Sequence, residues 1–322
     1  MSPAELLPIV GALSGPAFFL IFALAALGAP LLALVCLLAA SLRSTAHPEA
    51  YARRLLRMAL TCAVPSLLLF AAACALAAYR TAWLADWIQA APMGPGLFAV
   101  TALAFCASLV TMRLSRPSPR HGRQNSPLGQ AFILTLLAVG LLWLGLALGI
   151  SLQDQAQAVL RSPMVDGIGV APLMTPDVST LPNLWTALAA LVALSAAAAG
   201  AISLEYLLLL RDREPFGRDA LAHMLRLAAR CTLRSALLAG AFLPVLWTHL
   251  PAMPALQGGE TAAKTLLALC AAACVLLCVF SGIVARSARP WAKPLSIHAT
   301  ALVLWGGLTS LLSVALLCHY AV

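Results

Sequence analysis

The sequence predicts an all-helical integral membrane protein with eight transmembrane helices, and three observations support this fold class. Hydrophobic residues make up 62% of the 322 residues and charged residues only 10%, far from the balance of soluble domains. Apolar runs of about 17 to 28 residues follow one another along the chain, and about 20 residues cross a bilayer as a helix. The alternating pattern of a membrane β-barrel is nowhere seen, so a helical bundle is expected.

The expected spans follow the apolar runs in chain order. The first run begins at Leu6 and is too long for one span, and Pro8, Gly11, Gly15 and Pro16 interrupt it. We therefore expect a short interfacial helix at residues 3–15 before the first span. Amphipathic basic stretches precede the second and sixth spans, as in helices that enter from the cytoplasmic interface. The eight spans are residues 17–42, 58–79, 96–112, 128–152, 183–210, 231–250, 262–285 and 295–321.

The placement of positive charge predicts the orientation. Seventeen of the 20 lysines and arginines fall in loops or helix ends on one side of the spans, and only Arg80, Arg161 and Lys264 fall on the other. Because basic loops remain in the cytoplasm, we expect a multi-pass protein of the inner (cytoplasmic) membrane with both termini extracytoplasmic. This placement accounts for the net charge of +9, so the expected partner of the basic loops is anionic membrane lipid and not nucleic acid.

An internal repeat divides the chain. At a spacing of 173 residues Arg53 aligns with Arg226, Arg57 with Arg230, Arg113 with Arg286, Arg116 with Arg289 and Pro117 with Pro290. After this loop the spacing shortens to 162 residues. Four spans per half make the repeat parallel, with a pseudo-two-fold axis along the membrane normal. We expect a first four-helix half at 1–152, an extracytoplasmic connecting loop at 153–182 and a second four-helix half at 183–322.

The connecting loop at 153–182 is long and rich in Pro, Gly and Asp. Loops of this length are usually either functional or disordered. Two interpretations remain open: a cap or docking surface for an extracytoplasmic partner, and a plain linker.

Metal and haem sites are not expected. Cys270, Cys274 and Cys278 lie on one helical stripe, but no polar second shell accompanies them. A membrane haem b needs two histidines that face each other within a bundle. The only pairs at similar depth are His249 with His319, and His223 with His298. Both lie near the membrane interfaces, where solvated side chains are the simpler interpretation.

Glu205 is the most informative candidate site residue, because it lies inside an apolar run six residues before Arg211. An ionisable group in a membrane span is a functional hypothesis, and its partner should be named. We expect that partner to be Arg234 in the sixth span. Aligning Arg43 with Arg211 places Leu37 opposite Glu205, and the 173-residue spacing places Thr61 opposite Arg234, so both charges are missing from the first half. An ion pair and a quinone or proton contact are compatible roles for the two residues.

In architecture the chain resembles the eight-helix membrane subunits of bacterial respiratory oxidoreductases of the polysulfide-reductase and NrfD type. The segments "GPAFFLIF" and "HPEAYARRLLRM" are also similar to those of cytochrome-associated membrane proteins. The resemblance implies an electron-transport complex, bound quinone and partner subunits. It supplies no catalytic residue.

The sequence carries no phosphate-binding loop, HExxH, CxxCH or serine-elbow motif. We therefore expect a non-catalytic subunit of a respiratory or electron-transfer complex that contacts quinone. The alternatives are a small-molecule transporter or permease, with a path between the two halves, and a membrane scaffold without a ligand.

Overall fold

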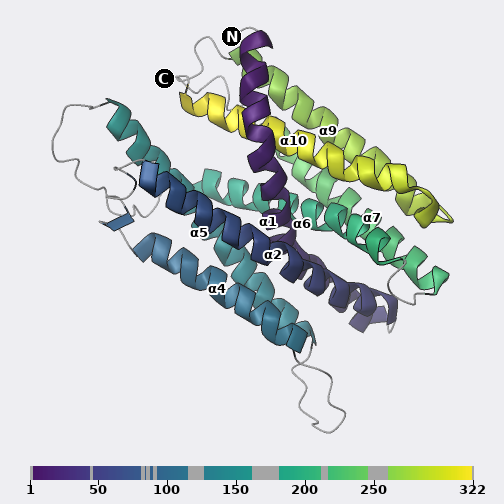
Figure 1. Cartoon of the computed structure of the whole chain (residues 1–322). Coiled ribbons are helices and arrows are strands. Elements are labelled where there is room, and N and C mark those ends of the chain that lie inside the picture. The colour runs from purple at the N-terminus through teal and green to yellow at the C-terminus, as the bar shows by residue number, and fades with distance from the viewer. Residues whose placement is uncertain are drawn as a thin grey trace.

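The structure is a computed structural model in which residues 3–43, 46–80, 84, 88–89, 93–114, 127–161, 181–211, 217–245 and 260–320 are described. The long elements within these ranges are helices, which Figure 1 shows as a bundle. In chain order they are α1 (Pro3–Arg43), α2 (Ala46–Arg80), α4 (Met93–Leu114), α5 (Pro127–Arg161), α6 (Leu181–Leu210), α7 (Arg218–Ala241), α9 (Glu260–Arg286), the short 3-10 helix η4 (Pro290–Ala292) and α10 (Pro294–Tyr320).

The all-helical prediction is confirmed for the described residues, and seven of the helices there are long and apolar enough to cross a membrane. Helix α7 is the exception, because Arg226, Arg230 and Arg234 lower its hydropathy. Its expected span, residues 231–250, also runs past the described part of the chain, which ends there at residue 245.

Two expected element boundaries differ in the structure. Residues 3–15 are the first part of the continuous 41-residue helix α1 and not a separate helix, although Pro8, Pro16 and Pro30 lie within it. A proline removes one backbone hydrogen bond, and a helix held by neighbours on several sides tolerates that loss. Helix α5 continues to Arg161, so the first residues of the expected 153–182 loop are helical.

Helices α1 and α6 form the centre of the bundle. A side chain at Gly28 of α1 would overlap the backbone carbonyl of Ser195 in α6, so only glycine permits this approach. Around the contact, α6 carries buried small residues from Ser195 to Ala201. Small residues allow helix backbones to approach closely in lipid, where packing replaces the hydrophobic effect as the driving force.

The other helices pack around this centre. The C-terminal part of α1 lies against α2, and its N-terminal part reaches α9 and α10, where Val10 packs near Leu266 and Val314. Helices α9 and α10 pack side by side, and the start of α1 and the end of α10 lie at the same end of the bundle (Figure 1).

Candidate functional site

Glu205 of α6 contacts His298 of α10. The Oε1 atom of Glu205 lies 2.9 Å from the Nδ1 atom of His298, and the two side chains are 21% and 54% exposed, respectively. Glu205 precedes Arg211 by six residues, or about 9 Å along a helix, and His298 follows Lys293 by five residues. The two residues therefore lie at similar depth, about one and a half turns from the basic ends of their helices.

The expected partner, Arg234, lies at a different depth. Gly200 of α6 packs directly against Thr232 of α7, and this contact fixes the register of the two antiparallel helices. Glu205 lies five residues beyond Gly200 in one direction, and Arg234 lies two residues beyond Thr232 in the other. This separation corresponds to about 10 Å along the axis. The Arg234 side chain is exposed, and within the described residues the carboxylate of Glu205 pairs with His298 instead.

A cavity of about 400 Å³ lies beside Glu205, between α1, α2, α6 and α10. Glu205 is the one charged residue in its lining. The side chains of Phe18, Leu209 and Leu302 in the lining are 48%, 72% and 61% exposed, so the cavity opens to the outer face of the bundle. The remaining lining residues are Ile21, Phe22, Met58, Thr61, Cys62, Ile202, Tyr206, Ala301 and Trp305.

Trp305 fixes one wall of this cavity. Its Nε1 atom donates a 2.8 Å hydrogen bond to the backbone carbonyl of Ser14, and its ring meets Phe18 edge to face at 6.4 Å. Pro16 removes a backbone N–H from α1, and the carbonyl four residues before a proline has no helical partner. That carbonyl belongs to Ala12. The carbonyl of Ser14, half a turn further along in the same disrupted turn, accepts the indole N–H of Trp305. His298 lies about two turns before Trp305 on α10, on the side of the cavity toward Lys293.

A second polar contact lies in the core and was not expected from the sequence. The hydroxyl of Tyr51 in α2 is 2.8 Å from that of Ser203 in α6, and both residues are buried. Ser203 in turn donates to the carbonyl of Gly200. Since Tyr51 is fully buried, its hydroxyl needs a partner within the protein. The only signal in the sequence was a tyrosine just before the arginines of an amphipathic stretch.

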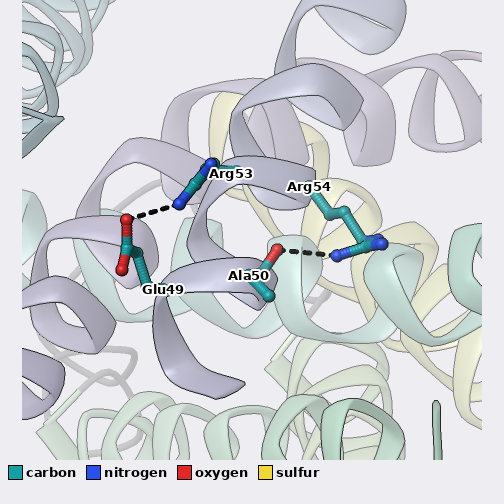
Figure 2. A network of polar contacts seen from close by, with 4 residues as sticks. All are labelled: Glu49, Ala50, Arg53 and Arg54. Atoms are coloured by element: carbon teal, nitrogen blue, oxygen red, sulfur yellow. Dashed lines mark hydrogen bonds and ion pairs between the residues drawn. The ribbon is translucent and has the colours of Figure 1, made fainter. Parts of the chain in front are cut away.

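The start of α2 carries a different ion pair, between the carboxylate of Glu49 and the guanidinium group of Arg53. Figure 2 shows Glu49 turned toward Arg53, one turn further along the helix, with 2.6 Å between Oε1 and Nη2. Arg54 donates from Nη1 to the carbonyl of Ala50 at 3.0 Å. Glu49 and Arg53 are both substantially exposed, and exposed i, i+4 pairs add little stability. This pair therefore serves as a comparison for Glu205, which lines a cavity.

The other histidines named from the sequence are not brought into a site by the described residues. His223 is exposed on α7. His249 and the side chain of His319 lie outside the described part of the chain. Haem ligation by these pairs stays a prediction. Among the described residues no group of three or more His, Cys, Asp or Glu side chains could hold a metal ion.

The fold and the site define a class: a polytopic α-helical protein whose helices suit a membrane, with an acid–histidine pair beside a cavity on the outer face of the bundle. No family model, no curated protein and no solved structure matches the chain.

Proposed function

We propose that this protein is a membrane-embedded, non-catalytic subunit of a respiratory or electron-transfer complex, and that it binds the headgroup of a quinone between Glu205 and His298. The observation that carries the proposal is the 2.9 Å acid–histidine contact at the edge of the 400 Å³ cavity. A polar, ionisable pair beside an apolar, aromatic cavity suits a ligand with a small polar headgroup and a long apolar tail.

The chemistry of the pair matches the two redox forms of a quinone. An ionised Glu205 accepts a hydrogen bond from Nδ1–H of His298 and fixes the tautomer of the ring. The neutral ring then presents Nε2 as an acceptor for a quinol hydroxyl, and the protonated ring presents an N–H donor for a quinone carbonyl. Reduction of a quinone to a quinol takes up two electrons and two protons. We assign the electrons to a partner subunit and the protons to a path through this pair.

The route of entry also supports a lipid-soluble ligand. The cavity is open on the lipid-facing side of α1, α6 and α10, and the rings of Phe18, Phe22, Tyr206 and Trp305 contribute to its lining. Aromatic side chains offer flat apolar faces against which a quinone ring can stack.

The packing supports the division into two parallel four-helix halves. Within the first half, α1 packs on α2 and α5, and α4 packs on α5. The corresponding helices of the second half repeat this pattern, with α6 on α7 and α10, and α9 on α10. The halves meet at α1 and α6. In our proposal the halves end and begin near residues 152 and 183, the 153–182 segment docks an extracytoplasmic partner, and both termini lie outside the inner membrane.

The contact of α1 with α6 also favours the subunit over a transporter. A transporter built from a parallel repeat would carry its substrate along the interface between the halves. At that interface the backbones meet closely at Gly28 and Ser195, and buried alanines surround the contact.

Photoaffinity labelling tests the proposed site. Purified protein in lipid nanodiscs is irradiated with an azido-substituted short-tailed ubiquinone, and the labelled residues are mapped by mass spectrometry. We expect labels in segments 18–22, 202–209 and 298–305, and competition by unlabelled quinone. Labelling that is spread over all lipid-facing helices and is not reduced by competitor would overturn the proposal.

A further inference from the structure

A second, larger hollow lies on the other side of the second half, between α7 and α9. Its volume is about 1050 Å³, and leucine, valine, alanine, glycine and cysteine side chains form most of its wall. Along α9 the lining runs from Leu267 to Arg286, or about 28 Å at 1.5 Å per residue. The α7–α9 groove thus extends over most of the thickness of a hydrocarbon core.

Positive charge gathers at one end of the α7–α9 groove. Arg286 is the one charged residue in the lining and lies at the cytoplasmic end of α9. On α7, Arg230 and Arg234 alternate with the lining residues Leu233 and Leu237 at spacings of three and four residues. Side chains at these spacings share one face of a helix. All three arginines are exposed. Arg226 is level with Ser287 at the end of α9, so Arg230 and Arg286 form a cationic rim at that end of the groove, and Arg234 lies one turn further along α7.

The neighbouring Arg226, in contrast, has a structural role, because it bonds to backbone carbonyls. Arg226 donates from Nε and Nη2 to the carbonyls of Ser287 and Ala288, at 3.1 and 2.8 Å, and so ties α7 to the turn after α9. In the part of the chain that the structure describes, Arg230, Arg234 and Arg286 form no ion pair with a carboxylate. Arginines at the edge of a membrane span need an anion or the headgroup layer to compensate their charge.

We propose that the α7–α9 groove binds an anionic phospholipid of the inner leaflet, with its acyl chains along Leu237, Cys278 and Gly282 and its phosphate at Arg230 and Arg286. Basic pockets between transmembrane helices on the cytoplasmic side bind acidic headgroups, and the guanidinium group pairs well with phosphate oxygens. This site is separate from the cavity at Glu205 and does not depend on the function of that cavity.

Native mass spectrometry of the full chain in detergent tests the site. Phosphatidylglycerol and phosphatidylcholine with the same acyl chains are added in equal amounts, and the mass of the protein–lipid complex identifies the bound lipid. We expect preferential retention of phosphatidylglycerol, and about a fivefold weaker affinity for each arginine removed in Arg230→Gln and Arg286→Gln. Arg113→Gln is the matched control, because Arg113 aligns with Arg286 in the repeat but lies at the end of α4, away from the groove.

A second variant tests the groove without changing its charge. Gly282 has open space where a Cβ would lie, so Gly282→Leu fills the groove with little strain and should displace the lipid. Equal retention of the two lipids would contradict the proposal, as would unchanged binding of phosphatidylglycerol in the arginine variants or in Gly282→Leu. A dimer that buries the groove and binds no phosphatidylglycerol would show that a second copy of the chain is the occupant instead.

Discussion

The carboxylate of Glu205 and the imidazole of His298 lie 2.9 Å apart, although 93 positions separate the two residues in the sequence. They join α6 and α10 near the basic ends of the two helices. Glu205 of the pair lines the cavity that Trp305 and Phe18 also help to line. The contact therefore places two ionisable side chains beside a cavity whose other lining residues carry no charge.

The contact of Gly28 with Ser195 should control the stability of the whole bundle. We expect Gly28→Ala to cost about 2 kcal/mol or more, because the added methyl group meets backbone that cannot move without separating α1 from α6. Thermal unfolding in detergent measures the effect. Gly140→Ala in α5 is the control, since nothing lies within 4 Å of its added Cβ. Equal melting temperatures for the two variants would show that the two helices do not meet at Gly28.

The buried hydroxyl pair of Tyr51 and Ser203 should contribute more to the free energy of unfolding than a single hydrogen bond would. Tyr51→Phe removes one hydrogen bond at a cost of about 1 kcal/mol, while Ser203 keeps its bond to Gly200. Ser203→Ala leaves the hydroxyl of Tyr51 buried without a partner and should cost about 1 to 3 kcal/mol. A double-mutant cycle in denaturant unfolding measures the coupling. Strictly additive effects would argue against a direct contact.

Trp305 should hold the N-terminal part of α1 against α10. Trp305→Phe keeps an aromatic ring near Phe18 but loses the hydrogen bond to Ser14, with an expected cost of about 1 kcal/mol. Limited proteolysis should then cut the first residues of α1 faster. Trp291→Phe, in the 3-10 helix η4 before the start of α10, offers a tryptophan control away from α1. The same cleavage rate in both variants would contradict the role of Trp305.

The proposed orientation rests on the charge distribution and can be tested with reporters. Alkaline phosphatase fused after residue 175 should be active, and the same enzyme fused after residue 121 should be inactive, because the positively charged loops remain in the cytoplasm. A cytoplasmic fluorescent reporter at the same two positions should give the opposite result. Activity at residue 121 and none at residue 175 would invert the proposed topology.

The sequence predicted Glu205 as the site residue and the helical class, because a lone acid in an apolar run and long apolar stretches are local patterns. It named the wrong contact for Glu205, since the choice between Arg234 and His298 depends on helix register. That register is set by the packing of Gly200 on Thr232, which no spacing in the sequence displays. His298 could have been considered on depth alone, as it lies five residues after Lys293.

Other features were beyond local patterns. The proline-containing start of α1 suggested a break, but contacts with α9 and α10 hold it as one helix. Both cavities depend on gaps between helices from different parts of the chain, so no single segment encodes them.

The affinity for a short-tailed ubiquinone analogue tests the central claim most directly. Quenching of tryptophan fluorescence is titrated in the wild type and in Trp305→Phe, and the difference isolates the signal of the cavity. We expect saturable binding that Glu205→Gln weakens roughly tenfold or more, because hydrogen bonds to charged groups contribute about 1.5 to 3 kcal/mol. The matched control Glu49→Gln, at the exposed pair of α2, should leave the affinity unchanged. Binding that does not saturate, or equal affinities in Glu205→Gln and the wild type, would contradict a quinone site at Glu205 and His298.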